Sequence, residues 1–189
     1  MGINIPGFIR YLREGNVHDA HALIREKSSL PSVCGRICTA PCEVACVLTE
    51  EGGVAIHIRD LERFASDFGK IKTVAKSSNT GKKVAIVGSG PAGLSASIEL
   101  AARGYQVTIF ESFDKPGGVL RYGIPEFRIP RKILDQEIKN IQARGVKIET
   151  NFLVGHTGTL EEICEEFSAV LLATGANIPK FMDIGGTNL

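Results

Sequence analysis

Tryptophan is absent from the 189 residues of the sequence, and net charge is almost absent as well. The 22 Lys and Arg residues nearly balance the 21 Asp and Glu residues, leaving a formal net charge of +1. Because affinity for nucleic acid depends on excess positive charge, we expect no nucleic-acid partner. No apolar run approaches the roughly 20 residues that span a bilayer, so we expect no membrane segment. The N-terminus lacks a secretory signal pattern, which predicts a cytoplasmic protein.

Glycine, in contrast, is abundant with 21 residues, a composition that suits ligand binding through the backbone. A chain of this length buries roughly 70% of its unfolded surface, enough for one good core or two small ones. The character of the sequence changes twice, which predicts two domains and a linker. The expected parts are a helical segment over 1–70, a polar, Lys-rich linker over 71–82 and an α/β segment over 83–189.

In the first segment, apolar residues recur at helical spacing in three stretches. Helices are expected from Pro6 to about Gly15, over 17–27 and over 58–68. The last helix carries one stripe of four apolar residues, Leu61, Phe64, Ala65 and Phe68.

In the second segment, continuous apolar runs mark buried strands. Strands are expected at 84–88, 107–111, 145–150 and 169–175, and helices near 91–103, 131–144 and 159–167. Short strand–helix–strand units of this kind predict an α/β fold with a parallel sheet.

A glycine-rich fingerprint, GSGPAG, lies at the first strand-to-helix turn. The first glycine permits the tight turn, the second lets the backbone approach a pyrophosphate, and the third lets helix and strand pack closely. The residues of the fingerprint are Gly88, Ser89, Gly90, Pro91, Ala92 and Gly93. Glu111, 18 residues after Gly93, ends the next strand, where a carboxylate binds the ribose of adenosine and repels a 2′-phosphate. The pattern therefore favours FAD or NAD over NADP.

Two further glycine features favour FAD over NAD. Gly117 and Gly118 follow Glu111 closely and give a second stretch of bare backbone for a long ligand. Ala173-Thr174-Gly175 ends another apolar strand, as in the flavin domain of two-dinucleotide flavoproteins.

Four of the five cysteines, Cys34, Cys38, Cys42 and Cys46, are spaced by four residues. In a chain without an export signal, metal or cluster ligation is favoured over disulfides. The spacing favours an iron–sulfur cluster, with structural zinc and buried free thiols as alternatives. Cys164 stands alone among carboxylates and is expected to be a small core residue. No catalytic triad is visible, and His18 and His21 are expected to be solvated.

A cysteine-bearing helical segment followed by an FAD fingerprint resembles a known family. The motifs LPSVCGRICTAPCEVAC, VAIVGSGPAGLSA, PGGVLRYGIPEFRIP and LLATGA resemble the small (beta) subunit of NADPH-dependent glutamate synthase. Its relatives include the large subunit of NADH-dependent ferredoxin:NADP oxidoreductase, sulfide dehydrogenase and the N-terminal part of dihydropyrimidine dehydrogenase. The resemblance implies a small all-α iron–sulfur domain followed by a partial Rossmann-like FAD-binding domain. It also implies electron transfer between NAD(P)H-reduced FAD and [4Fe-4S] clusters.

The resemblance also assigns roles by position. One cluster is held by Cys38 and Cys42 with Glu62 as a non-cysteine ligand, the other cluster includes Cys46, and Cys34 is not a ligand. In the FAD site, Gly88 to Ala92 hold the pyrophosphate and Glu111 the ribose. The remaining FAD contacts implied by the resemblance are Gly117, Gly118, Val119, Arg128, Val154, Thr174 and Gly175.

Two segments of the family pattern are not found in this sequence. The family has a further four-cysteine run before the INIPGF segment, and a complete NAD(P)H-binding domain after the ATGA segment. Neither is found in this sequence, which ends in GGTNL over 185–189. We therefore expect a partner subunit or missing segments to supply cluster cysteines and the nicotinamide site.

Two other functions stay open at this stage. A non-enzymatic assembly module could hold zinc or one local cluster with the same cysteines. An NAD-dependent dehydrogenase could use Gly88–Gly93 alone, but it would leave the Gly117–Gly118 and ATG features unexplained and lacks a visible acid or base.

Overall fold

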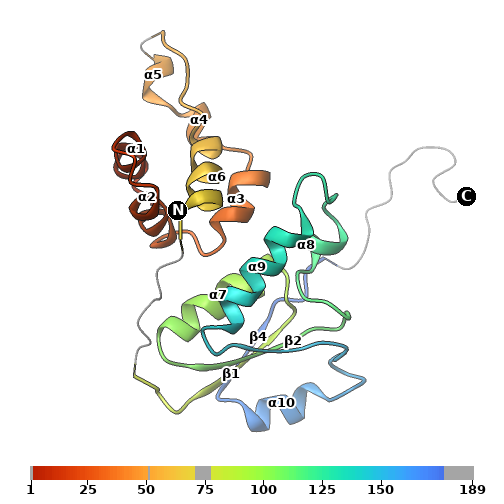
Figure 1. The fold of residues 1–189 in the computed structure, drawn as a ribbon. Helices are drawn as coiled ribbons and strands as arrows, with labels where there is room; N and C mark the ends of the chain where they lie inside the picture. Colours follow the sequence, from red (N-terminus) through yellow and green to blue (C-terminus); the bar gives the residue numbers. More distant parts are fainter. Residues whose placement is uncertain (1, 51, 71–77, 177–189) are drawn as a thin grey trace, which may run out of the picture.

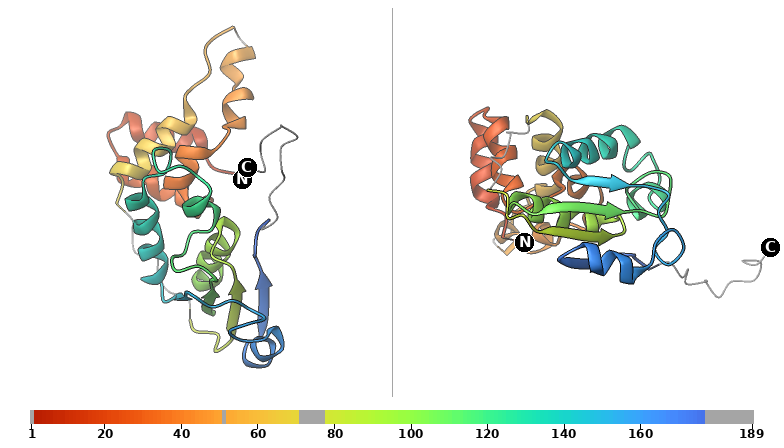
Figure 2. Two further views of the ribbon diagram at one scale, coloured as in Figure 1. Left: turned by 90° about the vertical axis from the view of Figure 1, so that its right-hand side faces the viewer. Right: turned by 90° about the horizontal axis from the view of Figure 1, so that it is seen from below.

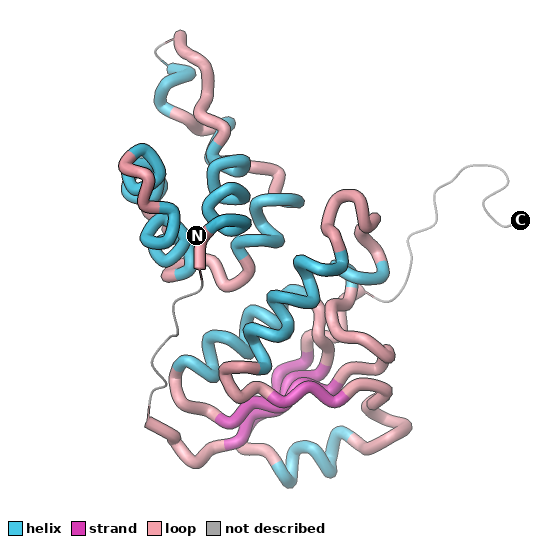
Figure 3. Tube along the Cα trace, in the orientation of Figure 1, coloured by secondary structure: helices cyan, strands magenta, loops and turns pink. Residues whose placement is uncertain are grey.

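The computed structural model describes residues 2–50, 52–70 and 78–176 (Figure 1). Helices α1 to α6 form the part before residue 71, and the four described strands gather in the part after residue 82 (Figure 3). Residues 71–77 of the expected linker lie outside the described residues, as does the GGTNL stretch.

The four described strands form one parallel sheet in the order β3-β2-β1-β4. They are β1 (Lys83–Val87), β2 (Gln106–Phe110), β3 (Lys147–Glu149) and β4 (Ala169–Leu172). Ile86 of β1 pairs with Ile109 of β2 on one side and with Leu171 of β4 on the other. The predicted α/β class is confirmed. β4 is shorter than expected because the chain leaves the sheet at Ala173.

Helices cover both faces of the sheet (Figures 1 and 2). On one face lie α7 (Pro91–Ala102) and α9 (Arg131–Gln142), and on the other lies α10 (Leu160–Glu166). α10 is fixed by Ile163, which packs with Phe167 against Ala85 and Phe110. Cys164 is exposed on α10, so the prediction that it is a core residue was wrong. The face of α10 that meets the sheet is occupied by Ile163 instead.

The first part is built from six short helices. They are α1 (Ile5–Arg13), α2 (Val17–Arg25), α3 (Pro31–Ile37), α4 (Pro41–Val44), α5 (Val47–Glu50) and α6 (Ile58–Phe68). The side chains of Asn4 and Asn16 cap α1 and α2 by accepting hydrogen bonds from the first-turn amides. The three predicted helices are confirmed, whereas α3, α4 and α5 are too short for hydrophobic periodicity to show them.

The apolar stripe expected on α6 is only partly buried. Phe64 is 46% exposed and Phe68 is 65% exposed, whereas Glu62 is 9% exposed and Ala65 is fully buried. The reason is the close approach of α3, where a Cβ atom added to Gly35 would lie 2.8 Å from the Cα atom of Arg63. The face of α6 next to α3 is therefore the one that carries Glu62.

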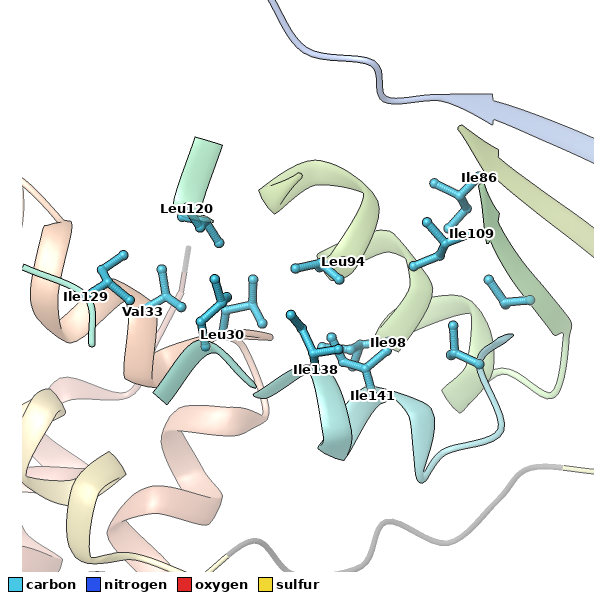
Figure 4. Packing of buried hydrophobic residues seen from close by; sticks show 13 residues of the cluster. Leu30, Val33, Ile86, Leu94, Ile98, Ile109, Leu120, Ile129, Ile138 and Ile141 are labelled. Carbon is cyan, nitrogen blue, oxygen red and sulfur yellow. The ribbon is translucent and has the colours of Figure 1, made fainter. Parts of the chain in front are cut away.

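The two parts share a hydrophobic core (Figure 4). Leu30 and Val33 of the first part pack with Ile129 and Ile138 of the second. The short helix α8 (Val119–Tyr122) adds Leu120 to the same core. This contact fixes the loop between α8 and α9 against α3.

A buried polar contact joins the two parts as well. Arg25 Nη2 lies 2.8 Å from Glu137 Oε1 and 2.6 Å from Glu137 Oε2. Arg25 Nε donates to His21 Nε2 over 3.0 Å, and His21 is 1% exposed. The prediction that His21 is solvated was therefore wrong, because the end of α6 packs against its side chain: a Cβ atom added to Gly69 would lie 2.4 Å from the Cβ atom of His21. Burial first, and then the nearby Arg25 charge, lower the pKa of His21.

No single described helix is both long and apolar enough to cross a membrane. Taken together, Pro31–Ile37 and Pro41–Thr49 have the length and apolar composition of a membrane span, but the pair is bent by 61°. The first helix of this pair, α3, packs against α6.

Candidate functional site

The glycine-rich turn between β1 and α7 has the geometry that the fingerprint predicts. Gly88 has a φ of 104°, and a Cβ atom there would lie 2.4 Å from the carbonyl oxygen of Ala173. A Cβ atom on Gly93 would lie 2.0 Å from the carbonyl oxygen of Gly88. A Cβ atom on Gly90 would meet nothing within 4 Å. Contacts within the protein therefore require glycine at positions 88 and 93. At position 90 a side chain would point into open space.

The N-terminus of α7 presents free backbone donors to this space. Its N-cap is Gly90, and no side chain of the described residues caps the helix. The first N–H groups of a helix lack partners inside the helix, and the helix dipole adds about half a positive charge at that end. The turn is thus built to bind an anion such as a pyrophosphate.

Glu111 follows β2 and is 4% exposed. Its Oε2 atom accepts hydrogen bonds from the amide and the hydroxyl of Ser89, and its Oε1 atom accepts from the amide of Phe113 and the hydroxyl of Ser112. Burial acts to raise the pKa of Glu111, but these four hydrogen bonds together outweigh burial and hold the pKa below its usual value. The carboxylate therefore joins β2 to the glycine-rich turn.

Gly117 and Gly118 pack against the same turn. The amide of Gly117 donates to the Ser89 hydroxyl over 2.9 Å. Gly118 has a φ of 51°, and a Cβ atom there would lie 2.7 Å from the Cα atom of Gly90. Only glycine permits this approach, so Gly117 and Gly118 pack directly onto the turn.

These elements surround a cleft of about 750 Å³. Most of the predicted FAD contacts line it, namely Gly88, Ser89, Gly90, Pro91, Ala92, Glu111, Gly118, Val119, Val154, Thr174 and Gly175. Gly93 and Gly117 lie behind this surface, each packed against the turn. Arg128 is exposed and is not part of the lining. Aromatic residues that the sequence did not suggest also line the cleft, among them Phe113 and Tyr122.

The cysteines lie in and around α3, α4 and α5. Cys38, which ends α3, and Cys42, in α4, are half-buried, and Cys46 is buried at 8% exposure. Cys34 lies inside α3, and burial raises the pKa of its thiol. Cys34 and Cys42 therefore lie in helices. Within the described ranges, no three His, Cys, Asp or Glu side chains converge on a common point as metal ligands do.

Glu62 lies on the face of α6 that meets α3, and it is a buried carboxylate, 9% exposed. Its Oε1 atom is buried and has no hydrogen-bond partner among the described residues. Burial raises the pKa of Glu62 to about 7. A buried carboxylate without a donor is costly, which is consistent with a site for a cation or an iron ion. Helical periodicity alone gave no sign of this burial.

Comparisons with known families divide the chain in the same order. Residues 1–74 match the family described as dihydropyrimidine dehydrogenase domain II, 4Fe-4S cluster. Residues 82–188 match the pyridine nucleotide-disulphide oxidoreductase family. The two matches confirm the cofactor classes predicted from the sequence, FAD and a [4Fe-4S] cluster.

Three curated relatives extend the comparison. The chain is 43% identical to NAD-dependent dihydropyrimidine dehydrogenase subunit PreT of Escherichia coli K12, over 93% of this chain and 45% of that protein. It is 38% identical to the beta subunit of NADP(+)-dependent formate dehydrogenase of Moorella thermoacetica, over 97% and 29% respectively. It is 33% identical to the glutamate synthase [NADPH] small chain of Azospirillum brasilense, over 98% of this chain and 40% of that protein. The chain thus spans less than half the length of each relative.

Among solved structures, the chain is similar to Mycobacterium tuberculosis FprA in complex with NADPH, with 27% identity and a TM-score of 0.50. The similarity covers 57% of this chain and 26% of FprA. The family resemblance expected from the motifs is confirmed. Because the second match covers more than half of its residues, the chain belongs to the pyridine nucleotide-disulphide oxidoreductase family, here with a 4Fe-4S domain II segment before it.

Proposed function

We propose that the chain is the part of an electron-transfer oxidoreductase that binds FAD and contributes ligands to [4Fe-4S] clusters. In this function, electrons pass between NAD(P)H-reduced flavin and the clusters. The observation that carries the proposal is the cleft, in which an uncapped helix N-terminus, a buried carboxylate and two glycine turns converge. This is the donor and acceptor set that an adenine dinucleotide requires.

The residues of the cleft fit FAD in a definite order. Pro91 has no N–H, so the amide of Ala92 is the first donor of α7 for the pyrophosphate, and the open space at Gly90 lets the phosphates approach the backbone. Glu111 binds the ribose of the adenosine half. Its four lone-pair positions are already used by protein donors, so the ribose hydroxyls replace the weaker ones, such as the Ser112 hydroxyl at 3.2 Å. Bound FAD supplies the conversion between hydride transfer and single-electron transfer.

The other predicted contacts complete this assignment. Gly118 and Val119 line the cleft together with Glu111, as do Thr174 and Gly175, which follow β4. Val154 offers backbone near Glu111, since the amide of Phe152 donates to the carbonyl of Glu111 over 2.9 Å. The predicted contact of Arg128 stays a prediction, because its side chain lies outside the lining.

For the iron–sulfur part, we assign Cys38, Cys42 and Glu62 to one cluster and Cys46 to the other. The support from the structure is the buried Oε1 atom of Glu62, which lacks a partner among the described residues. The remaining cysteines and the nicotinamide site are proposed to come from further segments or a partner subunit. The similar proteins named as a subunit or a small chain support this arrangement.

The test is anaerobic reconstitution of the chain with iron, sulfide and FAD, followed by absorption spectroscopy and metal analysis. We expect a flavin spectrum with one FAD per chain, and iron that decreases in Cys38→Ser and Cys42→Ser variants. Cys164→Ser is the matched control, since Cys164 is exposed on α10, far along the chain from the cysteine region. A colourless chain that takes up no FAD would disprove the function. Stoichiometric zinc without iron would support the assembly module instead.

A further inference from the structure

Two aromatic side chains, Phe113 and Tyr122, stand together at the cleft; we call them the aromatic pair. Their ring centroids are 4.5 Å apart and their planes are inclined by 32°. Both line the cleft, and Phe113 is 50% exposed and Tyr122 48% exposed. Large aromatic side chains contribute most to stability when they are buried, so core packing does not account for this half-exposed pair.

The aromatic pair is held in place by its polar neighbours. The Phe113 amide donates to Glu111 Oε1 over 2.9 Å, and the Phe113 carbonyl accepts from the Asn151 amide over 3.0 Å. The Tyr122 hydroxyl lies 2.6 Å from Asp114 Oδ1. The backbone of Phe113 and the hydroxyl of Tyr122 are therefore held in place before a ligand arrives, which lowers the entropic cost of binding.

The position of the pair indicates which part of a ligand it meets. The amide of Phe113 is bound to the same carboxylate that receives the ribose in the proposed function, so the ring lies within reach of the base on that ribose. The segment that carries Leu153 and Val154 runs beside Phe113, since the Asn151 amide donates to the Phe113 carbonyl, and both residues add apolar surface to the cleft lining. Leu153 is 49% exposed. A flat, aromatic group attached to the ribose can therefore lie against this aromatic and apolar part of the lining.

We infer that the aromatic pair is a stacking subsite for the adenine ring of the dinucleotide. The inference rests on the proposed function, since Glu111 must bind the adenosine ribose. Stacking of a base on an aromatic side chain is tolerant of base identity and does not need hydrogen bonds to the base. The subsite thus contributes affinity for the adenosine half of FAD, while the glycine turns receive the pyrophosphate.

The test uses the full chain and three probes, FAD, ADP and FMN, with affinities measured by isothermal titration calorimetry. ADP carries the adenine without the isoalloxazine, and FMN carries the isoalloxazine without the adenine. We expect Phe113→Ala to weaken the binding of FAD and of ADP by about tenfold each and to leave FMN unchanged. Phe127→Ala is the matched control, because Phe127 is 86% exposed and outside the cleft lining.

A spectroscopic readout is independent of affinity. The chain has no tryptophan and three tyrosines, so an ultraviolet difference spectrum reports tyrosine directly. We expect ADP to change the tyrosine absorption of the wild-type chain, and expect this change to disappear in Tyr122→Phe without a measurable loss of ADP affinity. Phe113→Leu, which keeps an apolar side chain without an aromatic face, replaces Phe113→Ala if circular dichroism shows that the alanine variant is unfolded.

The outcomes separate the subsite from the proposed function. If the wild-type chain binds FAD and ADP and Phe113→Ala or Phe113→Leu binds ADP equally well, the subsite is disproved and the proposed function stands. If the variants lose FMN affinity and keep ADP affinity, the pair lies at the isoalloxazine end and the inference is wrong. If the wild-type chain binds neither FAD nor ADP, the proposed function fails and the subsite fails with it.

Discussion

Two buried carboxylates, Glu111 and Glu62, show how differently the two parts of the chain are prepared for their ligands. Glu111 accepts four hydrogen bonds from the cleft, and its pKa is lowered in spite of burial. Glu62 has a buried Oε1 atom without a partner in the described ranges, and burial raises its pKa to about 7. The residues of the cleft donate hydrogen bonds to Glu111, whereas the described residues of the cysteine part donate none to Glu62 Oε1.

Backbone packing also differs between the two parts. In the cleft, Gly118 packs onto Gly90 and the loops are tied to one another. The α4–α5 region projects from the helical part (Figure 1), and Val44 is 83% exposed and Val54 82% exposed. Tight backbone contacts thus distinguish the nucleotide cleft from the cysteine region, and this contrast can be tested by substitution.

The largest effect is expected at Gly93. A methyl group in Gly93→Ala would lie 2.0 Å from the carbonyl oxygen of Gly88, so the turn must move away from α7. We expect a loss of about 3 kcal/mol in the free energy of unfolding, at the upper end of overpacking costs, and loss of FAD binding. Urea denaturation and FAD titration measure both quantities.

Gly90→Ala is the matched control, because its methyl group would meet nothing within 4 Å. We expect its free energy of unfolding to stay within about 1 kcal/mol of the wild type, since only the N-cap preference changes. FAD binding should still weaken, because the methyl group points to the ligand side. Equal stability of the Gly93→Ala and Gly90→Ala variants would contradict the tight packing of the turn.

The second prediction concerns the pH dependence of the iron-free chain at Glu62. Because burial raises the folded-state pKa from 4.5 to about 7, the folded state is favoured fully below pH 4.5 and loses this stability as the pH rises through about 7. The expected loss is on the order of 3 kcal/mol, since each unit of pKa shift corresponds to about 1.4 kcal/mol. Urea unfolding of wild-type and Glu62→Gln chains between pH 5 and pH 8 tests it. If the free energy of unfolding changes with pH equally in the wild-type and Glu62→Gln chains, Glu62 is solvated.

The third prediction concerns Glu111, whose pH dependence of stability is expected to be opposite to that of Glu62 and smaller. Its pKa is lowered in the folded state, so its contribution is present above its usual value of 4.5 and is lost as the pH falls through the folded-state pKa. In Glu111→Gln, the amide presents an NH₂ group to donors such as the Ser89 amide, and we expect a loss of about 2 kcal/mol at neutral pH. Thermal unfolding at several pH values should show that the difference from the wild type shrinks in acid. A constant difference would mean that the four hydrogen bonds do not depend on the charge.

The sequence predicted those features that depend on local patterns. The sheet, α7 and α9 follow from continuous apolar runs and from the glycine fingerprint, which carries its own spacing. The burial of Glu62 depends on the approach of α3 at Gly35, which no pattern within α6 encodes. The burial of His21 likewise depends on the approach of Gly69, which lies 48 residues further along the chain, at the end of another helix.

The aromatic pair was missed for a similar reason. Phe113 and Tyr122 are nine residues apart in a segment without periodicity. They meet because Glu111 fixes the Phe113 amide and the Asp114 carboxylate fixes the Tyr122 hydroxyl. Side-chain hydrogen bonds in loops are not visible as a spacing of apolar residues, so the cleft could be located from the sequence but its walls could not.

The smallest effect is expected at Cys164, which compares the thiols of the two parts. Cys164 is exposed, whereas Cys46 is 8% exposed. We expect Cys164→Ser to change the free energy of unfolding by less than about 0.5 kcal/mol, as is usual for a surface substitution. In the wild-type chain, alkylation followed by peptide mass spectrometry should modify Cys164 first and Cys46 only when the chain unfolds, because a buried thiol is inaccessible to the reagent. Early alkylation of Cys46 would show that the cysteine region opens before the sheet does, and would extend the contrast between the two parts from geometry to stability.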